Sequence, residues 1–118
     1  MTSRYRQIKT FEERKRESSH MREKYPDRVC IICEKSPKSG NIPDIDKNKF
    51  LVPSTLTVGQ FIFIVRKKIK VEPSKAIFVF VDAKILPPVS MTMIDLYVKH
   101  KHEDGLLYLT YATENTFG

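Results

Sequence analysis

The clearest helical pattern in this chain is one amphipathic stretch, TVGQFIFIVRKKIK at residues 57–70. Thr57 and Gln60 have the T-x-x-Q spacing of a capping box, and basic residues crowd the far end, where cations suit the helix dipole. An apolar stripe at helical spacing comprises Val58, Phe61, Ile62, Val65 and Ile69. The stretch therefore predicts a helix. Phe63 and Ile64 lie partly off the stripe, which indicates that another element or a partner covers a second face.

Short runs rich in β-branched and aromatic residues lie on both sides of this helix. They occupy residues 29–33, 50–52, 77–81 and 106–112. These runs predict four strands, and the proline- and glycine-containing loop between the first two favours an antiparallel pair. Between the last two runs a shorter helix begins at Ser90 or Thr92, with Ile94, Tyr97 and Val98 on one face.

The first segment, residues 1–24, is strongly charged and contains neither proline nor glycine. A narrow stripe at helical spacing comprises Phe11, Ser18, Met21 and Tyr25. Thr10 and Glu13 have the spacing of a second capping box, and Pro26 ends the pattern. We expect a helix that lies on a domain rather than inside it, because its other faces are charged.

The predicted order is a helix followed by ββαβαβ, which is the order of the α+β, ubiquitin-like β-grasp fold. A ferredoxin-like domain, βαββαβ, needs a helix between the first two strands. The loop at residues 35–48 is too rich in proline and glycine for one. We therefore expect an N-terminal helical extension over residues 1–28 and a β-grasp domain over residues 29–118, which ends in a short tail.

The composition is that of one ordinary globular domain: 118 residues, 41% hydrophobic and 30% charged. The net charge of +7 predicts attraction to anionic surfaces such as acidic peptides, acidic lipids, tubulin-like tails or nucleic acid, and names no partner. Nucleic-acid binding would rest on charge alone and is not predicted. No apolar run is long enough for a membrane span or a signal peptide, so a cytosolic protein is the default.

Motifs that would carry chemistry are few. Cys30 and Cys33 form a C-x-x-C, but no second pair exists to complete a zinc site, and residues three apart in a strand point to opposite faces. We interpret them as free, structural cysteines. His100 and His102 fit no known zinc spacing and are interpreted as surface residues. We predict no catalysis, no metal and no cofactor.

Seven segments, in order and at the right spacing, resemble the autophagy ubiquitin-like modifier family, the group that contains GABARAP. They are KYPDRV (24–29), KFLVP (49–53), LTVGQF (56–61), AIFVFV (76–81), PP (87–88), ED (103–104) and TFG (116–118). The resemblance covers the chain from about Phe11 to Gly118. It implies a β-grasp domain with two extra N-terminal helices and a modifier rather than an enzyme.

The resemblance also implies that Gly118 is activated and carried by the pathway's activating and conjugating enzymes, then amide-linked to phosphatidylethanolamine. Glycine suits this role because, without a Cβ, its carboxyl group can enter a narrow active site. Many members carry residues beyond this glycine that a cysteine protease removes. Either this member needs no such processing or the sequence is a trimmed form. The expected locations are the cytoplasm, the autophagosome membrane after lipidation, the vacuole or lysosome, and the cytoskeleton.

A second implied function is the docking of cargo receptors that carry aromatic-x-x-aliphatic motifs, added as a strand to the edge at residues 50–52. By matching position, the aromatic pocket comprises Glu17, Met21, Cys30, Ile32, Lys49, Leu51 and Leu106. The aliphatic pocket comprises Phe50, Val52, Pro53, Leu56, Phe61 and Ile64. The basic residues expected to attract acidic flanks are Arg28, Lys47, Lys49 and Lys68. Ile32, Leu56 and Phe61 can equally be ordinary core residues.

The chain departs from the family pattern at several points. Cys30 replaces a usual proline, Met21 a usual isoleucine, and Gly105-Leu106 a pair that is often aromatic. The loop near Gly40 and the turn near Lys84 are each about one residue longer than in GABARAP-like members. These departures leave conjugation intact and bear on peptide selectivity.

Two alternatives to a lipid-linked modifier stay open. One is a non-covalent trafficking adaptor that binds tubulin or other partners through the basic N-terminal segment. The other is a modifier that attaches to protein lysines, as ubiquitin does.

Overall fold

The computed structural model describes residues 3–37 and 42–113, and these form one mixed sheet with helices on both faces. The elements are α1 (Arg4–Ile8), α2 (Phe11–Lys24), β1 (Arg28–Lys35), β2 (Lys49–Pro53), α3 (Val58–Ile69), β3 (Phe78–Val81), α4 (Met93–His100) and β4 (Leu107–Ala112). Two N-terminal helices precede ββαβαβ, which confirms the predicted fold class. The division between residues 28 and 29 stays a prediction, and β1 begins at Arg28.

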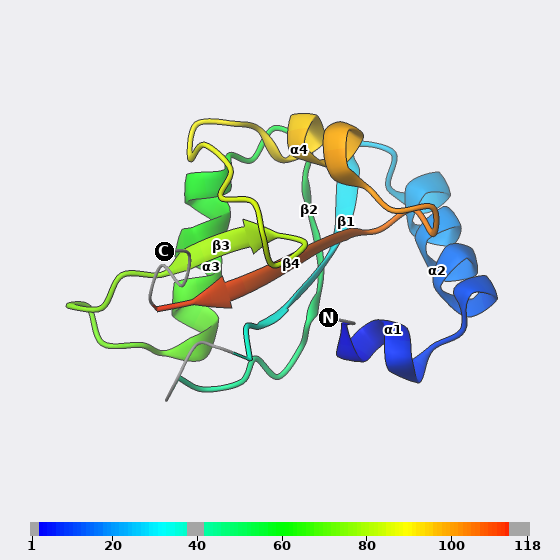
Figure 1. The fold of residues 1–118 in the computed structure, drawn as a ribbon. Coiled ribbons are helices and arrows are strands. Elements are labelled where there is room, and N and C mark those ends of the chain that lie inside the picture. The colour runs from blue at the N-terminus through cyan, green and yellow to red at the C-terminus, as the bar shows by residue number, and fades with distance from the viewer. Residues whose placement is uncertain (1–2, 38–41, 114–118) are drawn as a thin grey trace.

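The four strands lie in the order β2-β1-β4-β3, so β1 and β4 are central and β2 and β3 are edges (Figure 1). β1 pairs with β2 in antiparallel fashion and with β4 in parallel, and β3 pairs with β4 in antiparallel fashion. The antiparallel β1–β2 pair confirms the arrangement expected from the turn-rich link.

α3 covers one face of the sheet, and this face holds the main core (Figure 1). Four members of the predicted stripe, Val58, Phe61, Val65 and Ile69, are buried. Phe61 meets Phe50 of β2 edge-to-face, with ring centroids 5.2 Å apart. The capping box at Thr57 is present in both directions. The apolar spacing predicted this helix correctly because the residues of the stripe face the core.

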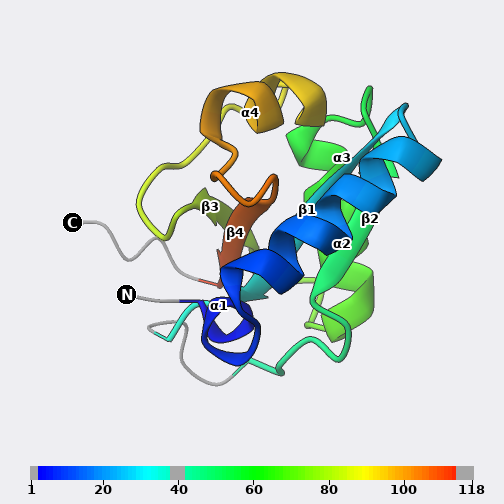
Figure 2. The ribbon, with the colours of Figure 1, turned by 90° about the vertical axis from the view of Figure 1, so that its right-hand side faces the viewer.

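α1 and α2 lie on the opposite face, as the side view shows (Figure 2). The apolar cluster under them is small: Tyr5, Cys30, Ile32, Leu106 and Tyr108, with Leu51 partly buried against it. Cys33 belongs instead to the α3-side core. The two cysteines are free and lie on opposite faces, which confirms the argument from strand alternation.

Two details of the helices differ from the prediction. In α4 the buried residues are Met93, Leu96 and Tyr97, whereas Val98 is 63% exposed, so the predicted face was wrong at Val98. In α2 the buried residues are Arg14 and Ser18. The predicted stripe missed Arg14, because its burial depends on an ion-pair partner far along the chain. Among the described residues, no helix is both long and apolar enough to cross a membrane.

Candidate peptide-binding site

The outer edge of β2 is a candidate docking edge, because β2 is the last strand on its side of the sheet. In an antiparallel ladder, opposed residues alternate between pairs whose main-chain groups face each other and pairs whose groups face away. Two main-chain hydrogen bonds show which pairs face each other: Cys33 N donates to Asn48 O at 2.8 Å, and Ser54 N donates to Asp27 O at 3.0 Å. These two bonds show that the pairs Cys33–Asn48 and Asp27–Ser54 face each other. Because hydrogen-bonded and non-hydrogen-bonded pairs alternate between them, the main-chain groups of Lys49 and Leu51 face away from β1.

The free edge is therefore short and well defined. Phe50 and Val52 turn their N–H and C=O groups to β1, while those of Lys49 and Leu51 face outward. Arg28 Nη1 donates to the carbonyl of Leu51 at 3.3 Å. Pro53 has no N–H to offer, so pairing by a further strand is limited at that end.

Side chains along β2 alternate between the two faces of the sheet. Lys49 and Leu51 lie on the α2 side, where Lys49 contacts Glu17 and Leu51 packs against the small apolar cluster. Phe50 and Val52 belong to the α3-side core. An added strand along this edge would thus reach both faces at once.

On the α2 side, the predicted aromatic pocket has a buried apolar floor and a charged wall. Cys30, Ile32 and Leu106 are all nearly inaccessible, which is consistent with the floor of the predicted pocket. Lys49 Nζ lies 2.6 Å from a Glu17 carboxylate oxygen, which places these two predicted residues together above the floor. Met21 is partly buried on α2.

Tyr5 and Lys9 also belong to this wall, and sequence reasoning missed both. Tyr5 Oη donates to Glu17 at 2.8 Å, and Lys9 Nζ lies 2.6 Å from the same carboxylate. Burial alone would raise the pKa of Glu17, but hydrogen bonds from Lys49, Lys9 and Tyr5 lower it to about 2. Burial, and then the hydrogen bond to Glu17, raises the pKa of Tyr5. No local signal identified Tyr5, because its partner lies on a different helix.

On the α3 side, the predicted aliphatic pocket combines core residues with a partly exposed rim. Phe50, Val52 and Phe61 are buried, whereas Leu56 and Ile64 are partly buried against that core. The remaining member, Pro53, is exposed. Lys68, one of the predicted basic residues, is exposed nearby and places Nζ 6.0 Å from the Phe50 ring centroid. Ile64, which lay off the helical stripe, therefore packs against the core to which Phe50 and Val52 belong.

The other predicted site residues are placed as follows. Arg28 is exposed and contacts the edge directly, and Lys47 is exposed in the loop just before β2. Gly118, the expected conjugation residue, lies outside the described residues.

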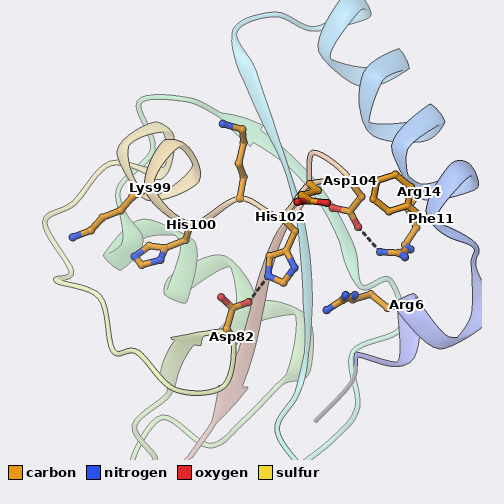
Figure 3. A pocket seen from close by; sticks show the side chains of 10 residues that line it. Arg6, Phe11, Arg14, Asp82, Lys99, His100, His102 and Asp104 are labelled. Atoms are coloured by element: carbon orange, nitrogen blue, oxygen red, sulfur yellow. Dashed lines mark hydrogen bonds and ion pairs between the residues drawn. The ribbon is translucent and has the colours of Figure 1, made fainter.

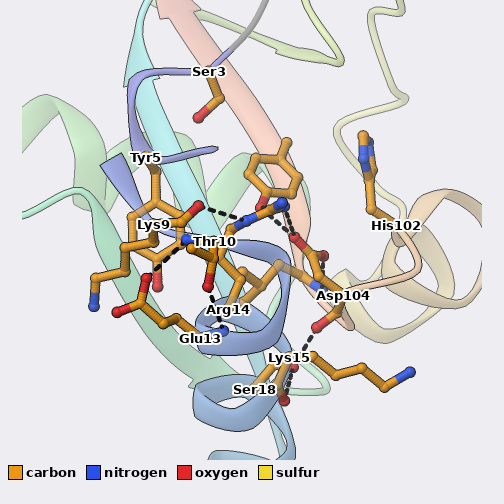
Figure 4. Close-up of polar contacts among 12 residues, drawn as sticks. Ser3, Tyr5, Lys9, Thr10, Glu13, Arg14, Lys15, Ser18, His102 and Asp104 are labelled. Carbon is orange, nitrogen blue, oxygen red and sulfur yellow. Dashed lines mark hydrogen bonds and ion pairs between the residues drawn. The ribbon is translucent and has the colours of Figure 1, made fainter. Parts of the chain in front are cut away.

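A buried polar network holds α2 against the sheet. Arg14 Nη1 lies 2.6 Å from Asp104 Oδ2, Tyr108 Oη also donates to that oxygen, and Ser18 Oγ donates to the Asp104 carbonyl (Figure 4). Gly105 follows with φ of +84°, and an added Cβ would lie 2.6 Å from Ser18 Oγ. The turn needs glycine both for its backbone angle and for the close approach of α2.

The cysteines and acidic groups offer no catalytic arrangement in the described part of the chain. Burial raises the pKa of the Cys30 thiol to about 11, and burial also raises that of Cys33, so neither is an activated thiolate. Within residues 3–37 and 42–113, no group of three or more His, Cys, Asp or Glu side chains is placed to hold a metal ion.

The fold and the edge define a ubiquitin-like β-grasp protein with an N-terminal helical pair. Three comparisons narrow this class. Residues 13–118 match the family model "Autophagy protein Atg8 ubiquitin like". The Autophagy-related protein 8 of Schizosaccharomyces pombe is 57% identical over 118 residues, which cover all of this chain and 96% of that protein. The protein of the same name from Aspergillus niger is 53% identical and is covered to 98%.

The solved structures give the same result. The crystal structure of Trypanosoma brucei ATG8 superposes with a TM-score of 0.91 at 45% sequence identity, with both chains covered completely. The chain belongs to the Atg8 family of autophagy ubiquitin-like proteins. Members of this family are non-enzymatic modifiers, and lipidation and cargo docking are typical of them.

Proposed function

We propose that the β2 edge docks cargo receptors and adaptors through aromatic-x-x-aliphatic peptides added as a strand. The observation that carries this proposal is the alternation along β2, which leaves the main-chain groups of Lys49 and Leu51 outward. Main-chain bonds would supply affinity, and the two sets of side chains would supply selectivity. The aromatic residue would lie over the Cys30–Ile32–Leu106 floor, and the aliphatic residue beside Leu56 and Ile64.

Acidic residues flanking the peptide would meet basic side chains around the edge. Arg28, Lys47, Lys49 and Lys68 all surround β2, and three of them are exposed. Because such exposed charges are screened by salt, they should mainly raise the association rate and should lose their effect at high ionic strength.

Calorimetry with a synthetic acidic aromatic-x-x-aliphatic peptide tests this site. Leu51→Asp and Ile64→Asp should each weaken binding at least roughly tenfold, since each places a charge in one of the two apolar contacts. Val98→Asp is the matched control, because Val98 is apolar and 63% exposed on α4. Unchanged affinity in both edge variants, with an intact fold by circular dichroism, would refute peptide docking at the β2 edge.

We further propose that Gly118 is the residue joined to phosphatidylethanolamine. Support comes from the family model, which includes residue 118 in its match, and from the TFG motif at residues 116–118. The partners in this reaction would be an activating enzyme, a conjugating enzyme and a cysteine protease that processes or delipidates. Lipidation would move the protein from the cytoplasm to the autophagosome membrane, with delivery to the vacuole or lysosome.

Reconstitution with the two enzymes and aminolipid vesicles tests conjugation. The unmodified chain should yield a membrane-bound, faster-migrating product, and Gly118→Ala should abolish it. Thr116→Ala is the control that keeps the terminal glycine. Survival of the product in Gly118→Ala would refute the role of Gly118, and mass spectra of branched lysine peptides in place of an ethanolamine lipid would indicate protein conjugation.

A non-covalent role on tubulin through the basic residues of α1 and α2 is separable from both proposals. It predicts that binding to microtubules persists in Gly118→Ala and is lost when basic residues such as Arg16 and Arg22, both exposed on α2, are replaced by glutamine.

A further inference from the structure

A cavity of about 430 Å³ lies on the α1 side of the sheet, over β4 and away from the docking edge. It is lined by residues of α1, by the end of β1, by the middle of β4 and by the turn after β3. A neighbouring cavity of about 560 Å³ shares Arg6, Asp82 and His102 with it. In Figure 3, Arg6 and His102 point toward the same space from α1 and from the segment after α4.

The charges around the first cavity are predominantly positive. Its cations are Arg4, Arg6, Lys35 and Lys84, and its carboxylates are Glu34 and Asp82. Both carboxylates are engaged within the protein. Tyr5 N donates to Glu34 at 3.1 Å, and Asp82 Oδ1 lies 2.6 Å from His102 Nε2.

Three of the cations remain available to a ligand. Lys35 donates to the Ile42 carbonyl at 3.2 Å and lies 3.6 Å from Asp44. Arg4, Arg6 and Lys84, in contrast, form no ion pair with any other residue in the described ranges. Arg6 stacks over the Tyr108 ring, 5.5 Å from its centroid, which leaves its N–H groups able to donate.

One buried hydroxyl at the cavity is also unsatisfied. Thr110 lines the cavity, and its Oγ1 is shielded from solvent without a hydrogen-bond partner in the described structure. An unpaired buried hydroxyl is costly, so it is rare in a folded protein. Because the residue itself is partly exposed, rotation about χ1 would bring the hydroxyl to a ligand in the cavity.

The turn that carries Lys84 is strained. Asp82 and Ala83 have φ values of +51° and +61°, a left-handed conformation that alanine rarely adopts. Such strain is often retained at ligand sites. Asp82, Ala83 and Lys84 all line the cavity, so the strained turn forms part of its wall.

We propose that this cavity binds a phosphate group, presented either by a small phosphomonoester or by a lipid headgroup. Arg4, Arg6 and Lys84 supply the positive charge, and the Thr110 hydroxyl supplies a hydrogen bond for which the described residues offer it no partner. Flexible cations around a partly enclosed space suit a compact dianion better than an extended peptide. The proposal does not rest on peptide docking or on conjugation.

The test is a nitrogen-15 NMR titration of the full chain with glycerol 3-phosphate, and a parallel titration with phosphatidylcholine vesicles that contain or lack phosphatidic acid. Saturable shifts at Arg6, Lys84 and Thr110 are expected in at least one arm. Shifts in the first arm indicate a soluble phosphomonoester, and shifts only with phosphatidic acid indicate a headgroup. The absence of saturable shifts at these residues in both arms would overturn the proposal.

Variants separate a binding role from simple surface charge. Arg6→Gln combined with Lys84→Gln should raise Kd roughly tenfold or more, since charge-assisted hydrogen bonds are lost. Lys67→Gln, an exposed charge on α3, should leave Kd unchanged. Equal effects of the two replacements would refute a specific site.

Thr110→Val gives the sharpest readout, because two effects run in opposite directions. The free chain should melt at a higher temperature, since a buried unsatisfied oxygen is removed. Phosphate binding should weaken several-fold. A higher melting temperature with unchanged binding would exclude the hydroxyl as a ligand contact.

Discussion

The two faces of the sheet are built differently, although they share the same four strands. The α3 face is a continuous apolar core, with Phe61, Val65 and Leu107 fully buried. The α1–α2 face has a small apolar cluster and relies on polar contacts, chiefly the Arg14–Asp104 ion pair and the hydrogen bonds to Glu17. The difference shows that the apolar face stabilises the fold, whereas the polar face positions two helices beside the proposed docking edge.

β2 contains this contrast within a few residues. Phe50 and Val52 contribute to the core, while Lys49 and Leu51 turn to the polar face and to the free edge. We therefore expect that substitutions of the residues on which docking depends lower the free energy of unfolding only slightly.

The largest expected effect is on the apolar face. Phe61→Ala should lower the free energy of unfolding by about 3–5 kcal/mol, because it leaves a cavity in a close-packed core. Leu51→Ala, at the partly exposed position, should cost about 1 kcal/mol. Urea unfolding measures both. Equal losses would show that the two faces do not differ as described.

Next in size is the buried ion pair on the polar face. Asp104→Asn keeps the shape of the side chain but leaves Arg14 uncompensated, which should cost about 3 kcal/mol. Asp95→Asn, an exposed carboxylate at the start of α4, is the control and should cost much less. Unfolding in urea and amide exchange in α2 report the effect. An unchanged free energy of unfolding in Asp104→Asn would show that the ion pair does not stabilise the fold.

The two capping boxes offer a matched comparison between the faces. Thr10→Ala and Thr57→Ala each remove the same cap and should each cost about 1 kcal/mol. Amide exchange should show local opening of α2 in the first variant and a global loss in the second, because only α3 belongs to the main core. Global loss in both variants would contradict a separable α2.

The last prediction concerns stability in acid. The pKa of Glu17 in the folded chain, about 2, lies below its ordinary value of 4.5, so its contacts stabilise the fold above about pH 4.5. That contribution is lost as pH falls from about 4.5 to 2. Glu17→Gln should remove this part of the pH dependence, whereas Glu12→Gln, exposed on the same helix, should not. Identical acid profiles for the wild type and Glu17→Gln would refute the lowered pKa.

Prediction from sequence succeeded where the signal was local and apolar. The α3 stripe, both capping boxes and the opposite faces of Cys30 and Cys33 follow from spacing alone. It failed at Arg14, which looks like a surface charge until Asp104, distant in the chain, is placed beside it. Val98 was assigned to the wrong side of α4, because in so short a helix one apolar residue fits either face.

The candidate site was predictable only in part. Motif position identified the residues around β2, but no sequence pattern reports which main-chain groups face outward, since that depends on register with β1. Tyr5 and Lys9 were missed for a similar reason: their contacts to Glu17 require α1 to fold back over α2.

Amide hydrogen exchange along β2, with and without an aromatic-x-x-aliphatic peptide, tests the central claim most directly. In the free chain the amides of Phe50 and Val52 should be protected, and those of Lys49 and Leu51 should exchange readily. Saturating peptide should protect Lys49 and Leu51 and leave Phe50 and Val52 unchanged. Peptide binding that leaves Lys49 and Leu51 exchanging as fast as in the free chain would contradict docking at this edge.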